Sequence, residues 1–189
     1  MKLYLVGLSC VGKTTIGKML SDTLDFSFYD LDVEVEKFYQ MPIEVFQEEC
    51  GSMDQFRLKA SKVLQQLLSM KGNVVIAGTP SGFTDSYLKT YQKFKNKGDL
   101  ISIYLHDYPE NIMKRLTFYD ENSQPIQLKL DARKKKRYLQ SIYEDYYYFH
   151  GSYLNTDIQI DISELNLPNI PLVIIEKIHL FSGLEMASF

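Results

Sequence analysis

The sequence predicts an α/β protein in which a five-stranded parallel sheet forms the middle of three layers and helices cover both of its faces. Short apolar runs alternate with longer segments of helical periodicity along the chain, which is typical of a parallel sheet with helical crossovers. The first apolar run, residues 3–6, passes through a glycine-rich turn into a helical segment. With 189 residues, 45% of them hydrophobic and 24% charged, the chain has the size and composition of one globular domain. We therefore expect a single domain over residues 1–189.

The first third of the chain predicts two strands separated by a helix. The first strand is "LYLV", residues 3–6, and it ends at Gly7. A second strand, "FSFYD", ends at Asp30. Two or three helices are expected after it, one opened by Pro42 and a long amphipathic one capped by Ser52. The helix between the strands is predicted by apolar residues at helical spacing in "TTIGKMLSDTL", namely Ile16, Met19, Leu20 and Leu24.

The middle of the chain predicts two further strands. "NVVIAG", residues 73–78, leads into the turn-rich segment "GTPSG". A helix is expected over residues 84–98, ending at Gly98, and the strand "LISIYL" follows at residues 100–105. Another helix is expected from Pro109 to about residue 116.

The last third of the chain begins with a segment that has no periodicity. Residues 117–131 are polar and contain a proline, so we expect a mobile loop there. Residues 132–149 are helical in pattern, and "TDIQIDI" alternates like a final strand. Pro171 starts a last helix. Ligands of parallel sheets bind beyond the carboxyl ends of the strands. Since Gly7, Asp30 and Gly78 all fall at such ends, we expect them to belong to one site.

Charge and composition exclude several classes of partner. The net charge of −3 argues against a nucleic-acid-coating protein, because that role needs a basic surface. The chain has neither a signal-peptide pattern nor an apolar run of the ~18 residues needed to span a bilayer. The two cysteines, Cys10 and Cys50, form no metal-binding or disulfide pattern. We expect a soluble cytoplasmic monomer that acts on a small molecule, without a nucleic-acid or membrane partner.

The segment "GLSCVGKT" matches the phosphate-binding pattern G-x-x-x-x-G-K-[ST] at every fixed position. It lies between a predicted strand and a predicted helix, so backbone N–H groups and the positive helix end would face the phosphates of a nucleotide. The alternative is an incidental glycine-rich turn. Cys10 either has no chemical role in the loop or is a redox-sensitive thiol. The expected ATP-binding residues are Gly7, Ser9, Cys10, Val11, Gly12, Lys13, Thr14 and Thr15.

Two of these residues have more specific expected roles. Lys13 should reach the β- and γ-phosphates and act in catalysis, and Thr14 should give its hydroxyl to Mg²⁺. Asp30 and Asp32 flank Leu31 just after the second strand, and at extended spacing both carboxylates can point into a cleft. One carboxylate near Mg²⁺ and another near an acceptor hydroxyl is what phosphoryl transfer requires. The alternative for Asp32 is a helix cap.

Over about its first 57 residues the sequence resembles shikimate kinase and its small P-loop relatives, which have a nucleoside-monophosphate-kinase-like fold. The resemblance rests on a glycine loop, a D-x-D pair at Asp30 and Asp32, an isoleucine–phenylalanine helix, and the pair Phe56–Arg57. It implies that Asp30 helps to hold Mg²⁺, that Asp32 binds and activates the acceptor hydroxyl, and that Arg57 binds the substrate. The alternative for Arg57 is a solvated helix charge. It also implies a substrate-binding helical region at about residues 32–70 and a lid at about residues 117–131.

The substrate side departs from the family pattern in the third strand and in the lid. Where the family has three consecutive glycines, this chain has Gly78, Thr79 and Pro80, so we expect Gly78 and Thr79 in a substrate site of altered shape. The family's lid arginine is replaced by Gln124. Losing such a cation can cost ~10³–10⁵ in rate unless another replaces it. Candidate replacements are Lys129, the run "RKKKR" at residues 133–137 and Arg115, which is also expected to contact the nucleotide.

Two further segments leave alternatives open. The run at residues 133–137 is either a solvated helix face, a phosphate contact on lid closure or a nucleic-acid contact. The family's second substrate arginine, which precedes a leucine–tyrosine pair, has two registers here, "QSIY" and "HGSY". Neither supplies arginine: the first offers Leu139, and the second offers Phe149 or His150. His150 is either a substrate ligand or a helix-end histidine, and the aromatic run at residues 146–149 either packs the helix or lines the pocket.

The nucleotide-binding groups match the family fully, whereas those that define shikimate are mostly changed. The sequence therefore predicts an ATP- and Mg²⁺-dependent kinase that phosphorylates a hydroxyl of a small polar metabolite other than shikimate. One alternative is a regulatory protein that binds nucleotide without efficient transfer. Another is a divergent shikimate kinase.

Overall fold

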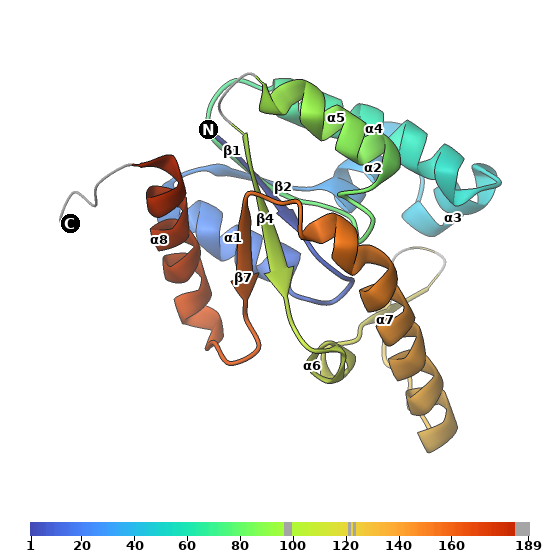
Figure 1. Ribbon diagram of the computed structural model, residues 1–189. Helices are drawn as coiled ribbons and strands as arrows, with labels where there is room; N and C mark the ends of the chain where they lie inside the picture. The colour runs from blue at the N-terminus through green and yellow to red at the C-terminus, as the bar shows by residue number, and fades with distance from the viewer. Residues whose placement is uncertain (97–99, 121, 123, 184–189) are drawn as a thin grey trace.

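Five strands form one fully parallel sheet, as the sequence predicts (Figure 1). The computed structural model describes residues 1–96, 100–120, 122 and 124–183. In spatial order the strands are β2-β3-β1-β4-β7. Because β1 lies between β3 and β4, its carboxyl end is flanked by the ends of two other strands, and the loop after it opens at the centre of that edge. The strands are β1 (Lys2–Val6), β2 (Ser27–Asp30), β3 (Val74–Ala77), β4 (Leu100–His106) and β7 (Ile158–Asp161).

Helices cover both faces of the sheet. On one face lie α1 (Lys13–Leu24) and α8 (Ile170–Ser182), and on the other lie α4 (Met53–Ser69) and α5 (Asp85–Lys95). Two short helices, α2 (Leu31–Tyr39) and α3 (Ile43–Glu49), pack together beside α4. The short helix α6 (Pro109–Lys114) contacts the long helix α7 (Ala132–Tyr153), whose first turns extend beyond the sheet (Figure 1).

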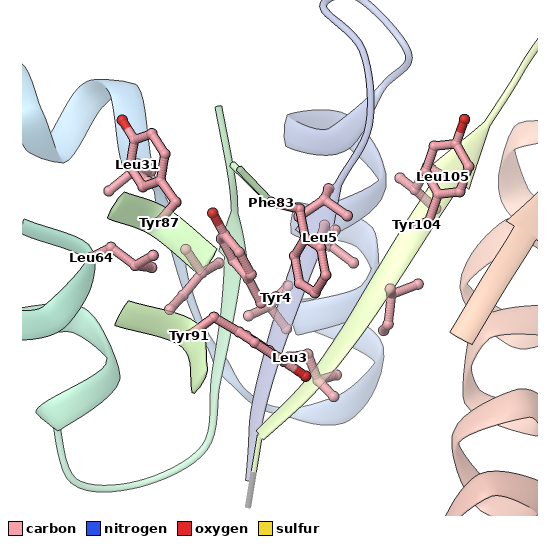
Figure 2. Close-up of a cluster of buried hydrophobic side chains, with 14 of the residues drawn as sticks. Leu3, Tyr4, Leu5, Leu31, Leu64, Phe83, Tyr87, Tyr91, Tyr104 and Leu105 are labelled. Carbon is pink, nitrogen blue, oxygen red and sulfur yellow. The ribbon is translucent and has the colours of Figure 1, made fainter. Parts of the chain in front are cut away.

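The core contains several buried tyrosines that pack among aliphatic side chains (Figure 2), and two of them, Tyr4 and Tyr91, also make hydrogen bonds. Tyr4 in β1 is fully buried and faces Tyr91 of α5, with ring centroids 6.4 Å apart. Tyr91 donates a hydrogen bond to Asp157, which also accepts from the backbone N–H of Ser102 in β4. Tyr4 donates at 2.7 Å to the carbonyl of Gly82 and so holds the segment that follows β3.

The predicted elements are confirmed, with shifted ends, and two segments differ. Residues 117–131 are predicted to form a mobile loop, and within this segment Phe118–Tyr119 (β5) and Pro125–Ile126 (β6) pair as a short antiparallel hairpin that the sequence did not indicate. The helix expected over residues 132–149 continues to Tyr153 because Phe149 and Tyr153 are buried against the body of the protein. The expected helix stop at Gly98 lies outside the described residues.

Candidate active site

The loop after β1 has the backbone shape of a phosphate cradle. Gly7 and Gly12 have φ angles of 146° and 111°, in the region that favours glycine. A Cβ on Gly7 would lie 2.6 Å from the carbonyl oxygen of Leu105, so the loop can pass β4 only with glycine there. Helix α1 begins directly afterwards at Lys13, and its first turn has neither a side-chain cap nor an acidic residue. The N–H groups of this turn are therefore suited to an anion.

Lys13 is buried beneath this loop. Its Nζ donates hydrogen bonds to the carbonyl oxygens of Gly7 and Leu8, at 3.0 and 2.8 Å. Burial lowers the pKa of Lys13 to about 8, and the nearby carboxylates of Asp32 and Asp30 oppose that shift. The ammonium group is thus held at the edge of the loop, where a phosphate in the cradle would meet it.

Thr14 and Asp30 bring the loop and the end of β2 together. The hydroxyl of Thr14 donates to Oδ2 of Asp30 at 2.6 Å, and Oδ1 of Asp30 accepts from the backbone N–H of Asp32. This second contact caps α2, so the cap is Asp30 and not Asp32, and the extended spacing expected for the pair is wrong. Asp32 lies in the first helical turn because the Asp30 carboxylate satisfies its N–H group there. Both carboxylates nevertheless face the same cavity.

Asp32 has a strongly shifted pKa. Burial and the negative charge of Asp30 raise the pKa to about 7, with smaller contributions from Glu36 and Glu44, while Lys13 acts in the opposite direction. A carboxyl group in this environment can exchange a proton near neutral pH.

A cavity of about 650 Å³ opens at the carboxyl ends of β1, β2 and β3. It is lined at one end by Ser9 and Thr14 of the phosphate loop and by Asp30 and Asp32. The rest of its wall comes from α2, α3, α4, the segment after β3 and α7. We call this part the acceptor end, lined by Val33, Glu36, Ile43, Glu44, Gln47, Met53, Phe56, Arg57, Thr79, Pro80, Ser81, Asp145 and Phe149.

Arg57 reaches the acceptor end from α4. Its side chain is 12% exposed, and Nη1 lies 3.2 Å from Oδ2 of Asp85 and 3.5 Å from Oδ1 of Asp54. Its Nε is buried and makes no hydrogen bond of normal geometry among the described residues. The guanidinium is thus ion-paired through Nη1, whereas its Nε–H group could donate a hydrogen bond to a ligand.

The segment after β3 forms another wall of the acceptor end. Thr79 lines the cavity and is 2% exposed, and its hydroxyl lies beside the phenol of Tyr87 in α5, where it opposes the rise that burial causes in the pKa of Tyr87. Gly78 does not itself line the cavity, because it lies against Tyr4 and the carbonyl of Leu5. Tyr153 of α7 donates to the carbonyl of Pro80, which fastens α7 to this wall.

Helix α7 carries both registers considered for the family's second arginine, and only the second contributes a residue to the cavity lining. Phe149 lines the cavity, and Asp145 lines it one turn earlier. His150 lies instead in a smaller hollow with Tyr104 and His106, so it does not line the acceptor end. The ring of Phe149 therefore stands where the second register would place a substrate-binding arginine.

Arg115 and the basic residues of the lid region lie outside the cavity lining. Arg115 is ion-paired with Asp107, a buried carboxylate that follows β4 and also accepts from Asn111. Gln124 is exposed, and the run at residues 133–137 is exposed on the first turns of α7. The contacts expected of these residues with a nucleotide or phosphate stay predictions.

Three acidic residues of the cavity were missed by the sequence reasoning, although local spacing could have indicated two of them. Asp32 and Glu36 are four residues apart on α2, and Asp145 and Phe149 are four apart on α7, so each pair shares a helix face. The missed acidic residues are Glu36, Glu44 and Asp145.

Within the described residues, no cluster of three or more His, Cys, Asp or Glu side chains could hold a metal ion by itself. Mg²⁺ that arrives with a nucleotide needs only one or two protein ligands, since phosphates and water supply the others. Thr14 and Asp30 fit that requirement. None of the helices in the described part of the chain is long and apolar enough to cross a membrane.

Comparison with known proteins relates this chain and its fold to the shikimate kinases. A family model described as shikimate kinase matches residues 9–165, well beyond the first 57 residues. A shikimate kinase from Alkaliphilus oremlandii is 33% identical over 171 residues, which cover 89% of this chain and 93% of that protein. A bifunctional shikimate kinase/3-dehydroquinate synthase from Thermotoga maritima is 35% identical over 117 residues, covering 62% of this chain and 22% of that longer protein.

The structure of a shikimate kinase from Bacteroides thetaiotaomicron superposes with a TM-score of 0.77 at 18% identity and covers 97% of this chain and 98% of that chain. This likeness shows the fold, a P-loop nucleoside-monophosphate-kinase-like sheet with helices on both faces. The chain belongs to the shikimate kinase family. By family it is a small-molecule kinase, a phosphotransferase that acts on a hydroxyl group.

Proposed function

We propose that this protein uses ATP and Mg²⁺ to phosphorylate a hydroxyl group of a small polar molecule other than shikimate. The observation that carries the proposal is that one cavity joins the phosphate loop and the Asp30–Asp32 pair to a wall suited to a small polar molecule. ATP would supply the γ-phosphoryl group, and Mg²⁺ would neutralise charge on the phosphates.

Each group in the cavity has a place in this reaction. Thr14 and Asp30 would hold Mg²⁺, directly or through water, and Lys13 would stabilise negative charge on the phosphates. Asp32 would orient the acceptor hydroxyl and take its proton as the new O–P bond forms, while the bond from the γ-phosphorus to the β,γ-bridging oxygen breaks and ADP leaves. Arg57 and Thr79 would position the acceptor.

The acceptor end supports the exclusion of shikimate. Arg57 is the one cationic side chain among the described residues that line it, and that guanidinium is already paired with Asp85. Phe149 stands at the candidate place of a second arginine. A substrate carboxylate would therefore find few of the charge-assisted hydrogen bonds that normally hold such a group. A monomeric state, a cytoplasmic location and the absence of nucleic-acid partners stay predictions.

The proposal is tested by incubating purified protein with ATP, Mg²⁺ and a broad panel of hydroxylated metabolites, shikimate included. Phosphorylated products are detected by mass spectrometry and ³¹P NMR. We expect product from at least one panel member, and Asp32→Asn should lower its rate by about 10²–10⁴-fold. Asp22→Asn, an exposed aspartate on α1, is the matched control.

If ATP binds but no panel member yields product above the Asp32→Asn background, the protein is a nucleotide-binding protein rather than a kinase. Efficient turnover of shikimate would refute the exclusion of that substrate.

A further inference from the structure

Arg57 brings to the acceptor end of the cavity a hydrogen-bond donor that the protein itself does not satisfy. The residue lines the cavity, and its Nε is buried without a hydrogen bond of normal geometry among the described residues. A buried N–H group without an acceptor is costly, so a ligand atom that accepts its hydrogen bond is favoured there. The fitting atom is an oxygen, because an ammonium group would bring a second donor to the same place.

The positive charge of the same guanidinium is already compensated by the protein. Nη1 lies 3.2 Å from Oδ2 of Asp85 and 3.5 Å from Oδ1 of Asp54, and neither aspartate lines the cavity. A ligand carboxylate at Nε would be the third negative group around one cation, so repulsion from the two aspartates would offset its attraction to Arg57. An uncharged oxygen accepts the hydrogen bond from Nε without that repulsion.

The surroundings of Asp32 also disfavour an anionic ligand. Burial and the negative charge of Asp30 raise the pKa of Asp32 to about 7. A carboxylate in the same cavity would oppose the ionisation of Asp32 further. Asp32 must be ionised to take the proton of the acceptor hydroxyl, so an uncharged acceptor leaves more of the enzyme in the active form at neutral pH.

Phe149 adds an apolar surface to this wall. Its ring lines the cavity at one of the two candidate places of the family's second arginine. Arg57 is the one cationic side chain among the described residues of the lining, so no second cation is present there to hold a carboxylate. The carbon skeleton of a ligand can pack against the ring instead.

We propose that the acceptor is an uncharged polyol, a molecule with several hydroxyl groups and neither a carboxylate nor an ammonium group. Asp32 orients the hydroxyl that receives the phosphoryl group. A second oxygen of the molecule accepts a hydrogen bond from Nε of Arg57, and its carbon skeleton packs against Phe149. This inference rests on the proposed kinase function and names the substrate class of the same site.

The test compares acceptors that differ in a single group. Glucitol is assayed with ATP and Mg²⁺ against gluconate, which has a carboxylate in place of one terminal alcohol, and against glucamine, which has an ammonium group there. Glycerol, glycerate and serinol form a second set of the same design. We expect kcat/KM for the uncharged member of at least one set to exceed that of both charged members by about 10-fold. Equal or faster turnover of a charged member in both sets would overturn the inference while leaving the kinase function intact.

Two variants separate the hydrogen bond from the charge. Arg57→Lys keeps the positive charge but removes the Nε–H group, and it should weaken glucitol binding about 10-fold. Asp85→Asn keeps the Nε–H group but removes a negative partner, so it should strengthen gluconate binding and leave glucitol binding unchanged. Lys62→Arg is the matched control, because Lys62 is exposed on the same helix as Arg57 and does not line the cavity. Wild-type preference for glucitol over gluconate in both variants, with circular dichroism showing both folded, would contradict the proposal.

A binding measurement separates this inference from the proposed function. Saturation-transfer NMR with the full chain, Mg²⁺ and a non-hydrolysable ATP analogue compares the members of the two sets without any need for turnover. If no uncharged member binds more tightly than its charged partners, or if no member binds, the inference fails whatever the protein phosphorylates. If an uncharged member binds selectively but no acceptor reacts, the kinase function fails while the binding preference is retained.

Discussion

The hydroxyl of Thr14 donates a 2.6 Å hydrogen bond to Oδ2 of Asp30, which ties the first turn of α1 to the end of β2. The two groups come from different segments and meet at the mouth of the cavity. Both are ligand types that Mg²⁺ accepts. We expect the Mg²⁺ dependence of ATP binding to depend on this contact.

Thr14→Val should raise the Mg²⁺ concentration required for half-maximal ATP binding by about 10- to 100-fold, because it removes a proposed ligand and the hydrogen bond that orients Asp30. The measurement is an Mg²⁺ titration of ATP affinity by isothermal calorimetry. Thr23→Val is the control, since Thr23 is exposed on the same helix and donates only to the carbonyl of Met19. An unchanged Mg²⁺ requirement in Thr14→Val would contradict the proposed role.

Lys13→Met should weaken ATP binding strongly and lower kcat by about 10²–10³-fold, because the buried ammonium group is lost from the edge of the phosphate loop. Calorimetry and steady-state assays measure the two effects. Lys18→Met provides the matched control, because Lys18 is exposed on the same helix. Wild-type ATP affinity in Lys13→Met would refute the nucleotide site itself.

Asp85→Asn should improve the binding of hydroxy acids such as shikimate, because it frees one side of the Arg57 guanidinium from its 3.2 Å partner. Asparagine tolerates the positive φ of 50° found at this position. The free energy of unfolding should fall by less than about 1 kcal/mol, since the Asp85 side chain is exposed. Asp54→Asn, at the longer distance of 3.5 Å, should have the smaller effect on hydroxy-acid affinity. Equal changes in hydroxy-acid affinity in the two variants would show that the ion pair with Asp85 does not limit the binding of an acid by Arg57.

Asp157→Asn should lower the free energy of unfolding by about 1.5–3 kcal/mol at neutral pH. The Asp157 carboxylate is paired with Lys95 at 2.6 Å and accepts hydrogen bonds from Tyr91 and Ser102. Burial raises the pKa of Asp157, but these contacts outweigh burial, so the net pKa lies below its ordinary value of 3.8.

A carboxyl group with a lowered pKa in the folded state stabilises the fold above its ordinary pKa, and the stabilisation is lost as pH falls through the lowered value. The difference between wild type and Asp157→Asn should therefore be constant above about pH 5 and shrink below pH 3.8. Urea unfolding at several pH values measures it. A difference that persists undiminished in acid would show that packing, and not charge, is responsible.

Much of the fold could be predicted because its signals are local. The spacing of apolar residues indicated the five strands of the parallel sheet and the main helices, and the spacing of Gly7, Gly12, Lys13 and Thr14 indicated the loop between the first strand and the first helix. The expectation of extended spacing at Asp30 and Asp32 was wrong because local sequence does not distinguish two arrangements of this pair. Extended spacing and a helix cap both place two carboxylates near each other, and only the hydrogen bond from the Asp32 N–H to Asp30 distinguishes them.

The acceptor end could be predicted only in part. Arg57 and Thr79 were expected from the family pattern, and both line the cavity. The pairing of Arg57 with Asp85 depends on how α4 meets the start of α5, which no local pattern encodes. The choice of Phe149 over His150 depends on how α7 rotates as Tyr153 packs against the segment after β3.

The sequence by itself determined the position of the phosphate loop, because such a loop needs only a strand, two glycines, a lysine and a helix start that are neighbours in the chain. The tertiary structure decided which side chains meet the acceptor. Glu44 and Asp145 are about a hundred residues apart in the chain, yet they line one cavity because the sheet brings the ends of β2 and β3 together and α7 folds back over them. The lining of the acceptor end comes from residues far apart in the sequence, so only the folded chain brings these side chains together.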